Sequence, residues 1–319
     1  MSTVGKMTQN RPILVTGSHR SGSTWVGNMI ALSPEVQYVP ESFKPNGLLR
    51  HHRLLENWFQ RFETDEGEKF AEKLDRVFRG KSSIFEAFSL FNPDGNFDLR
   101  NSPARLKFYR DCKWNRITGR RNLRPLLKDP IALFSAEWLT QNFDSQNIVL
   151  IRHPAAFVGS LLRLNWRFDF RNFLNQPKLM KQYLAPFDEK IHAFSGDFLE
   201  EACLLWSCLH FVIQKYRATY PNWIFLRHED ISRNPLVEFE RLFQKINVDF
   251  SAEIRREVMK FSASENPQEV QKIGQIHQLK RDSRANIKNW KRRLTNEQIE
   301  KIRESTKAVS EHFYGDDDW

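Results

Sequence analysis

The sequence lacks any long apolar run. Among its 319 residues no stretch approaches the roughly 18 to 20 consecutive apolar residues that a membrane-spanning helix needs. Its first residues, MSTVGKMTQNRP, have no apolar core of the kind found in a signal peptide. We therefore expect a protein without a transmembrane segment.

Cysteine is also scarce. The three cysteines, Cys112, Cys203 and Cys208, have no metal-ligand spacing, and their odd number argues against a disulfide framework. Histidines and carboxylates form no cluster with the spacing of a metal site either. We expect no bound metal and a reducing location, for which the cytoplasm is the simplest choice.

Positive charge is in excess. Lys and Arg number 49 against 39 Asp and Glu, a formal net charge of +10, which favours anionic partners. The basic residues are spread along the chain, apart from a cluster at 288–293, and no recognition motif for nucleic acids is present. We attribute part of the excess to an anionic nucleotide and most of it to solvated surface. The expected partners exclude nucleic acid, and the sequence does not indicate an oligomeric state.

Strand-like and helix-like segments alternate along much of the chain. Compact strands are expected at 13–16, 35–40, 125–128, 147–151 and 223–226. Strands that alternate with helices indicate an α/β fold, a three-layer sandwich around a mostly parallel central sheet. Because ligands bind at the carboxyl ends of such strands, the residues that directly follow each strand are the candidates for function.

The remaining chain carries helical patterns. They are expected at 47–62, around 70–78 and 84–91, at 106–117, 131–142 and 198–220, and from after 228–230 to 246. The pattern at 198–220 is the longest. We expect a flexible N-terminus over residues 1–10 and a single domain over 11–319, with helical insertions at about 46–122 and 166–200. The aromatic and charged stretch 166–173 is expected to be a lid over an acceptor or an amphipathic surface segment.

The stretch ILVTGSHRSGSTWVGNMIA at 13–31 joins a strand to a helix through a loop that contains Gly17 and Gly22. Backbone N–H groups in such a loop, together with the helix dipole, form an anion cradle. The spacing matches a Walker A loop, except that Ser23 replaces the lysine after the second glycine and the charge lies three residues earlier, at Arg20. The pattern indicates a related anion; an ordinary strand-to-helix turn is the alternative.

Two stretches resemble sulfotransferases that use 3′-phosphoadenosine 5′-phosphosulfate (PAPS). Residues 20–25 (RSGSTW) resemble the 5′-phosphosulfate loop of that family, and Arg152 and Ser160, with a proline between them, resemble its 3′-phosphate-binding element. The resemblance covers about 11–45 and 124–165, and less firmly 223–243. It implies PAPS as the sulfuryl donor, with adenine stacking near Trp25. The implied donor-binding residues are Arg20, Ser21, Gly22, Ser23, Thr24, Trp25, Arg152 and Ser160.

Sulfuryl transfer is an in-line displacement that needs neutralised charge, an aligned donor and a base. The resemblance implies that Arg20 and Lys128 neutralise charge. The segment from Pro34-Glu35-Val36 to Glu41 resembles carbohydrate and tyrosyl-protein sulfotransferases, which makes Glu41 the predicted base. Phenol and steroid enzymes use a histidine after a lysine-threonine strand end, which the sequence at 128–130 lacks. The expected acceptor bears a hydroxyl, on a glycan, a lipid or a small molecule, with a carbohydrate favoured.

Other interpretations stay open at this point. Glu41 and Lys128 are alternatively a surface acid and a solvated strand-end lysine. A P-loop kinase or NTPase would need lysine at position 23 and a strand-end aspartate for Mg²⁺. A basic nucleic-acid-binding protein is suggested only by the charge and by the cluster at 288–293.

Overall fold

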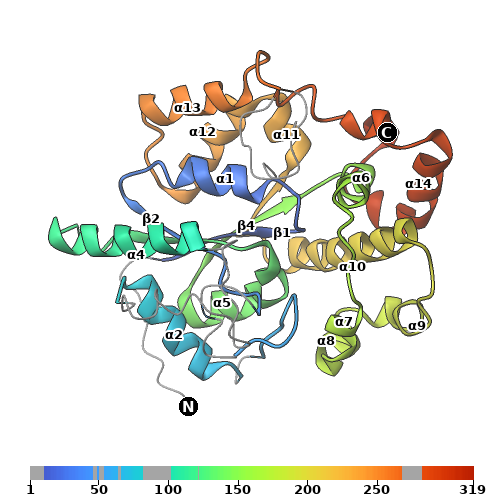
Figure 1. The fold of residues 1–319 in the computed structure, drawn as a ribbon, viewed down its shortest axis with the longest axis horizontal. Coiled ribbons are helices and arrows are strands. Elements are labelled where there is room, and N and C mark those ends of the chain that lie inside the picture. Colours follow the sequence, from blue (N-terminus) through green and yellow to red (C-terminus); the bar gives the residue numbers. More distant parts are fainter. Residues whose placement is uncertain are drawn as a thin grey trace.

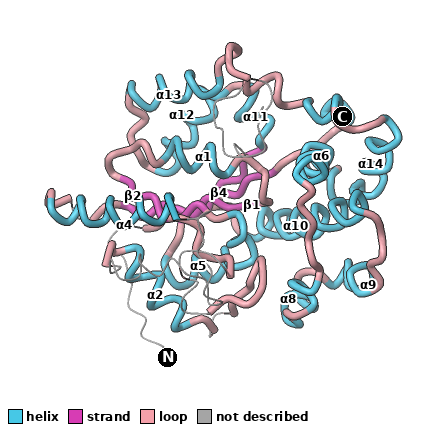
Figure 2. The backbone as a smooth tube through the Cα atoms, in the orientation of Figure 1, coloured by secondary structure: helices cyan, strands magenta, loops and turns pink. Residues whose placement is uncertain are grey.

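A parallel sheet forms the centre of the molecule (Figure 2). The computed structural model describes residues 11–45, 49, 54–63, 66–81, 102–120, 122–267 and 282–319. The five strands of the sheet lie in the order β2-β3-β1-β4-β5, and every neighbouring pair is parallel. They are β1 (Ile13–Gly17), β2 (Val36–Val39), β3 (Arg124–Lys128), β4 (Gln146–Ile151) and β5 (Ile224–Arg227). All carboxyl ends therefore meet at one edge, as the sequence predicts.

Helices cover both faces of the sheet (Figure 1). One layer contains α1 (Ser23–Ile30), α11 (His228–Arg233), α12 (Pro235–Ile246) and α13 (Ala252–Ser262). The other side of the sheet is covered by α2 (Glu68–Phe78), α5 (Ala136–Phe143), α6 (Pro154–Leu164), α10 (Phe198–Thr219) and α14 (Asn296–Ser310). Further helices are α4 (Ser102–Ile117), α7 (Arg171–Leu174), α8 (Pro177–Gln182) and α9 (Asp188–His192). The predicted three-layer α/β architecture is confirmed.

Successive side chains of β1 point to opposite faces of the sheet, so the strand contributes to two separate apolar clusters. Ile13 and Val15 belong to the apolar cluster under α1, α12 and α13, whereas Leu14 belongs to the larger cluster on the other face. Each of these side chains is at most 1% exposed. A strand buried on both faces needs apolar residues at every position, which explains the continuous apolar run at its start.

The longest helix of the described chain, α10, organises the larger cluster. Its first turn is closed by a capping box: the Asp197 side chain accepts from the Glu200 amide at 2.8 Å, and the Glu200 side chain accepts from the Asp197 amide at 3.1 Å. Its inner face is lined by fully buried residues that include Trp206 and Tyr216. The prediction of the longest helix at 198–220 is confirmed.

Two predicted helices differ from the structure. No helix forms in the described part of 47–62, residues 49 and 54–62, where Phe59 has φ 57° and its ring is fully buried against Phe134 and Phe173. Aromatic burial there outweighs the helical pattern. The helix expected after 228–230 begins already at His228 and is divided at Asn234, because Pro235 has no N–H and disfavours helical dihedrals in the preceding residue.

The other helical patterns have clearer outcomes. Those around 70–78 and at 106–117 form α2 and α4. The segment at 131–142 forms a 3₁₀ turn (Pro130–Ser135) followed by α5. The pattern at 84–91 and the flexible N-terminus at 1–10 lie outside the described residues.

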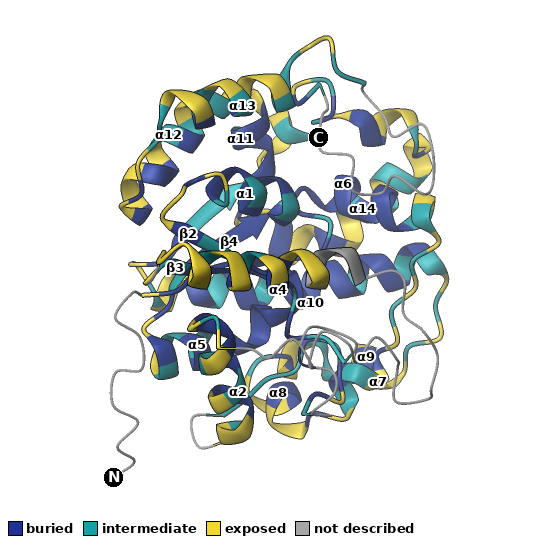
Figure 3. Cartoon of the chain, turned by 60° about the vertical axis from the view of Figure 1, so that its left-hand side comes forward, coloured by how far each residue is buried: buried dark blue, intermediate teal, exposed yellow. Residues whose placement is uncertain are grey.

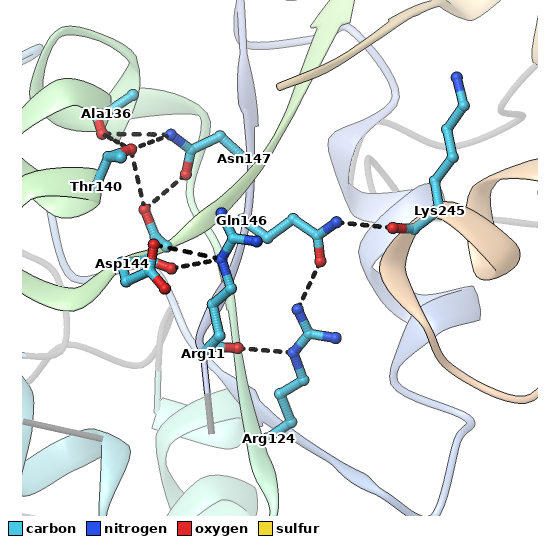
Figure 4. Close-up of polar contacts among 9 residues, drawn as sticks. Arg11, Arg124, Ala136, Thr140, Asp144, Gln146, Asn147 and Lys245 are labelled. Carbon is cyan, nitrogen blue, oxygen red and sulfur yellow. Dashed lines mark hydrogen bonds and ion pairs between the residues drawn. The ribbon is translucent and has the colours of Figure 1, made fainter. Parts of the chain in front are cut away.

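A polar network joins the amino ends of three strands (Figure 4). Nε of Arg124 donates to the carbonyl of Arg11 at 2.6 Å, and Nη2 donates to Oε1 of Gln146 at 2.6 Å. Nη1 of Arg124 donates to the carbonyl of Ile246, in the last residue of α12. Burial, with the nearby Arg11 guanidinium, lowers the pKa of Arg124 to about 10, so the group stays charged at neutral pH. One guanidinium therefore fastens β1, β3, β4 and α12.

We expect Arg124→Met to lower the free energy of unfolding by about 2 to 3 kcal/mol, because two partly buried acceptors, on β4 and α12, and the exposed Arg11 carbonyl lose a charged donor. The matched control is Arg11→Ala, which removes an ion pair to Asp144 between side chains that are 45% and 77% exposed. Exposed ion pairs contribute little to the free energy of unfolding, and this substitution keeps the main-chain carbonyl of residue 11 that Arg124 binds. Thermal unfolding of both variants measures the difference; equal midpoints would contradict the role given to Arg124.

Candidate functional site

The loop between β1 and α1 has a conformation that two glycines make possible. Gly17 has φ 131° and lies beside β4, where a Cβ atom would come within 2.3 Å of the Leu150 carbonyl oxygen. Gly22 has φ 94°, and a Cβ atom there would lie 2.5 Å from Nδ1 of His228. Arg20 also has a positive φ, 65°. Side chains larger than hydrogen are strained or blocked at both glycines.

This loop leads directly into the N-terminus of α1. The helix begins at Ser23, has no acidic residue in its first turn, and has no side-chain cap. Amide N–H groups in a first turn have no partner within their own helix, and the dipole adds positive potential. The buried hydroxyls of Ser18 and Ser21 have no hydrogen-bond partner in the structure. The loop therefore has the donors that a phosphate-like anion requires.

The second predicted stretch contacts this loop. Nε of Arg20 donates to Oγ of Ser160 at 3.2 Å, although the two residues are 140 positions apart. Nη1 of Arg152 donates to the main-chain carbonyl of Arg20. Ser160 lies on α6, which starts with Pro154 at its first position, and it is 3% exposed. The loop after β1 and the segment after β4 thus form one basic site.

The main chain around Arg152 is held by two side chains, one of which is itself hydrogen-bonded to a third. Nε1 of Trp206, on α10, donates to the Arg152 carbonyl at 2.9 Å. The amide of His153 donates to Oε1 of Glu229 at 3.1 Å, and the hydroxyl of Tyr314 donates to Oε2 of the same carboxyl at 3.0 Å. Burial raises the pKa of Glu229, against the effect of these hydrogen bonds. This support fixes the end of β4.

Sequence reasoning missed Trp206 and Tyr314 as supports of the site. Trp206 lies on the apolar face of a long helix, where its spacing is that of any core residue. Tyr314 lies near the end of the described chain with no motif around it. Glu229, by contrast, follows a strand and could be found by its position.

Glu41 and Lys128 form an ion pair at the ends of neighbouring strands. Nζ of Lys128 donates to Oε1 of Glu41, and Nζ of Lys44 lies 2.8 Å from Oε2. Burial opposes ionisation of Glu41, but the two ammonium groups outweigh it and lower its pKa to about 2. Burial likewise opposes the charge on Lys128, and Glu41 raises the pKa of Lys128 above its usual value. Lys128 is 6% exposed, so it is not a solvated surface lysine.

Asp129 fixes the turn that carries Glu41. Its Oδ2 accepts from the amides of Ser42 and Phe43, each at 2.7 Å, and its Oδ1 accepts from the Ile131 amide at 3.1 Å. Burial, together with the nearby Glu41 carboxylate, raises the pKa of Asp129 to about 6 despite these bonds. Sequence reasoning gave Asp129 no such role, although an aspartate before proline is a common signal for a helix start.

Aromatic packing surrounds the loop. Trp25 is 9% exposed, and its ring packs in a T-shaped arrangement with Phe239, with 5.2 Å between the ring centroids. Its Nε1 has no hydrogen-bond partner. His19 packs on Phe157 and Trp166, each at 5.0 Å between ring centroids. Burial, with the Arg20 charge, lowers the pKa of His19 to about 3, so the ring is neutral. Adenine stacking near Trp25 and a lid at 166–173 stay predictions.

Two further findings concern the described residues as a whole. None of their helices combines the length and the apolar character that a membrane span requires. No group of three or more His, Cys, Asp or Glu side chains among them is arranged to hold a metal ion.

Comparison with known proteins identifies the family. A family model described as a sulfotransferase domain matches residues 10–315 of the chain. The chain belongs to the sulfotransferase domain family. This membership makes the protein a transferase enzyme that acts in sulfotransfer, and such enzymes generally use PAPS as the donor. It favours sulfotransfer over the kinase and nucleic-acid-binding alternatives.

Solved sulfotransferase structures are similar to this sulfotransferase over most of its length. The sulfotransferase domain of the Synechococcus PCC 7002 olefin synthase is 17% identical, with 99% of each chain covered and a TM-score of 0.48. The sulfotransferase domain from the curacin biosynthetic pathway is 16% identical. The match covers 94% of this chain and 98% of that domain, with a TM-score of 0.46. Sulfotransferase STF9 of Mycobacterium avium is 14% identical. The match covers 95% of this chain and 77% of STF9, with a TM-score of 0.44. No curated protein matches the chain.

We expect Gly22→Ala to lower the free energy of unfolding of this sulfotransferase by about 1 to 3 kcal/mol, because a Cβ atom would strain a positive φ and press on His228. Gly159→Ala is the matched control. Gly159 lies in helix α6, and a Cβ atom there would lie at an ordinary contact distance of 3.6 Å from Leu294. Thermal unfolding of both variants checks the expectation. Wild-type behaviour of Gly22→Ala would show that the loop relaxes in solution.

Proposed function

We propose that this sulfotransferase transfers the sulfuryl group of PAPS to an acceptor hydroxyl, with a carbohydrate-like acceptor favoured. The observation that carries the proposal is the contact of Arg20 with both Arg152 and Ser160. Two proposed anion-binding segments border one site. They are joined by the hydrogen bond from Arg152 to Arg20, two residues that are 132 positions apart in the sequence. PAPS carries anionic groups at its 5′ and 3′ positions, so a site with two basic segments suits it.

The residues divide between the two ends of the donor. The amides of Gly22, Ser23 and Thr24, with Ser21 and Arg20, bind the 5′-phosphosulfate at the N-terminus of α1. Arg152 and Ser160 bind the 3′-phosphate, and Trp25 lies near the adenine. The unpartnered buried hydroxyl of Ser21 supports this assignment, because a donor buried without a partner costs free energy until a ligand satisfies it.

The reaction is an in-line displacement at sulfur. The acceptor oxygen forms a bond to sulfur as the bond from sulfur to the bridging phosphate oxygen breaks, and the acceptor proton passes to Glu41. The bond electrons leave with 3′-phosphoadenosine 5′-phosphate. Arg20, Lys128 and the loop amides neutralise the charge that develops on the sulfuryl and phosphate oxygens. Anchors at both ends of the donor align it for attack.

The ion pair of Glu41 with Lys128 connects donor binding to the strength of the base. A carboxylate with a pKa of about 2 has little affinity for a proton at neutral pH. Donor oxygens that attract the Lys128 ammonium reduce its stabilisation of the Glu41 carboxylate, which raises the pKa of Glu41. The base therefore gains proton affinity when the donor is in place.

Domain organisation and location complete the proposal. We propose one sulfotransferase domain over 11–319, in which segments at about 46–122 and 166–200 contribute to the acceptor side. Cys112, Cys203 and Cys208 are buried and free. Free thiols support a reducing compartment, and we place the protein in the cytoplasm.

We expect Arg152→Met to weaken binding of 3′-phosphoadenosine 5′-phosphate about 10- to 100-fold, because a charged hydrogen bond to phosphate contributes roughly 1.5 to 3 kcal/mol. Isothermal titration calorimetry measures the affinity. The control, Arg163→Met, removes an exposed arginine from the last turn of α6 and should leave affinity unchanged. Equal affinities in the two variants would remove Arg152 from the donor site.

We expect Glu41→Gln to lower the turnover number by at least about 100-fold, because the amide cannot accept the acceptor proton. Affinity for 3′-phosphoadenosine 5′-phosphate should not fall, since the change removes a negative charge beside Lys128. Transfer of labelled sulfate from PAPS to a panel of sugars, alcohols and tyrosyl peptides measures turnover.

The control for Glu41 is Glu35→Gln, at an exposed position on the same segment. Wild-type turnover in Glu41→Gln would assign the base to another residue. ATP hydrolysis without sulfate transfer by the wild-type chain would overturn the proposed function itself.

A further inference from the structure

Helix α4 presents an exposed apolar surface. Leu106, Trp114 and Ile117 are 48%, 63% and 68% exposed. Among the described residues three other large hydrophobic side chains are exposed; none exceeds 47%, and they are distributed over three other segments. Large apolar side chains concentrated on one helix indicate an interaction surface.

The helix is attached to the domain by its opposite side. Phe108, Tyr109 and Cys112 are 2%, 7% and 6% exposed, and Nε2 of Gln37 on β2 donates to Sγ of Cys112 at 2.7 Å. Leu106, Arg110, Trp114 and Ile117 follow one another at spacings of four, four and three, so they form one exposed stripe of the helix, and their exposure places that stripe away from the attachment. Figure 3 shows the outward side of α4 as exposed, and Figure 1 shows one end of the helix extending past the sheet.

Cations alternate with the apolar side chains on this surface. Lys107, Arg110 and Lys113 are exposed, and Asp111 is the acid among them, 2.8 Å from Nζ of Lys107 and 3.1 Å from Nη2 of Arg110. Such exposed ion pairs are weak in water, so the cations can exchange this partner for another anion. The surface is thus apolar and basic together.

This mixture suits a lipid surface better than a protein interface. A protein that covered Trp114 and Ile117 would also bury the neighbouring cations, at a cost in desolvation. A second copy of the chain would place cations against cations. At an anionic bilayer the apolar side chains enter the acyl boundary while Arg110 and Lys113 reach lipid phosphates. Tryptophan is favoured at this interface.

We propose that the outward face of α4, formed by Leu106, Lys107, Arg110, Lys113, Trp114 and Ile117, binds the surface of an anionic lipid bilayer. The helix lies on the bilayer and does not cross it. None of these residues belongs to the proposed donor site. Helix α4 lies within the segment at about 46–122 that we propose for the acceptor side, so the test measures vesicle binding and not turnover.

The test is co-sedimentation of the full chain with vesicles. Wild type should bind vesicles of equal parts phosphatidylcholine and phosphatidylserine and bind phosphatidylcholine alone much more weakly. Arg110→Gln with Lys113→Gln should lower the partition coefficient about 30-fold, from about 1 kcal/mol for each cation. Trp114→Ser with Ile117→Ser should lower it at least about tenfold, through lost apolar burial.

Two double variants serve as matched controls. Arg256→Gln with Lys307→Gln removes two exposed cations from α13 and α14, and Val237→Ser with Met259→Ser removes two exposed apolar side chains from α12 and α13. Neither should change the partition coefficient. Circular dichroism checks that every variant is folded.

Several results would overturn the proposal. Equal binding to neutral and anionic vesicles would remove the role of the cations, and equal losses in the control variants would make the effect one of total charge or total hydrophobicity. Sedimentation velocity gives a further test. An oligomer that dissociates on Trp114→Ser with Ile117→Ser, without any vesicle binding by the wild type, would make the face a contact between copies of the chain.

Discussion

The hydrogen bond from Arg152 to the carbonyl of Arg20 is the contact on which the site depends. It joins the loop after β1 to the end of β4, and the contact of Arg20 with Ser160 continues it into α6. Without this link the chain would have a phosphate loop and a separate strand-end arginine. With it, two basic segments border one site, and the supports from Trp206 and Glu229 hold the second segment in position.

Charge and burial oppose each other at the neighbouring strand ends. Lys128, Glu41 and Asp129 lie close together with little solvent, where an isolated charge would be costly. The Lys128–Glu41 pair stays ionised because each group stabilises the other, while Asp129 is stabilised by main-chain amides. A carboxylate and an ammonium group are thus held in contact at the carboxyl ends of neighbouring strands.

The sequence predicted the sheet, its parallel direction and the placement of Arg20, Glu41, Lys128 and Arg152 at its carboxyl edge, because short apolar runs and the residues after them are local signals. It could not predict that Phe59 is buried outside a helix, since distant rings decide this. The supporting contacts of Trp206 and Asp129 were hidden for the same reason. An apolar pattern predicts that a side chain is buried, but it does not predict which distant residue that side chain contacts.

The amino ends and the carboxyl ends of the strands have separate roles. Arg124 joins the amino ends of three strands and the end of α12, whereas the residues predicted to bind anions lie at the carboxyl ends. Because these clusters share no side chain, residues around the substrates can be exchanged during evolution while the opposite rim keeps the framework assembled. A family that acquires new acceptors by altering loops benefits from this division, since each innovation leaves the structural foundation intact.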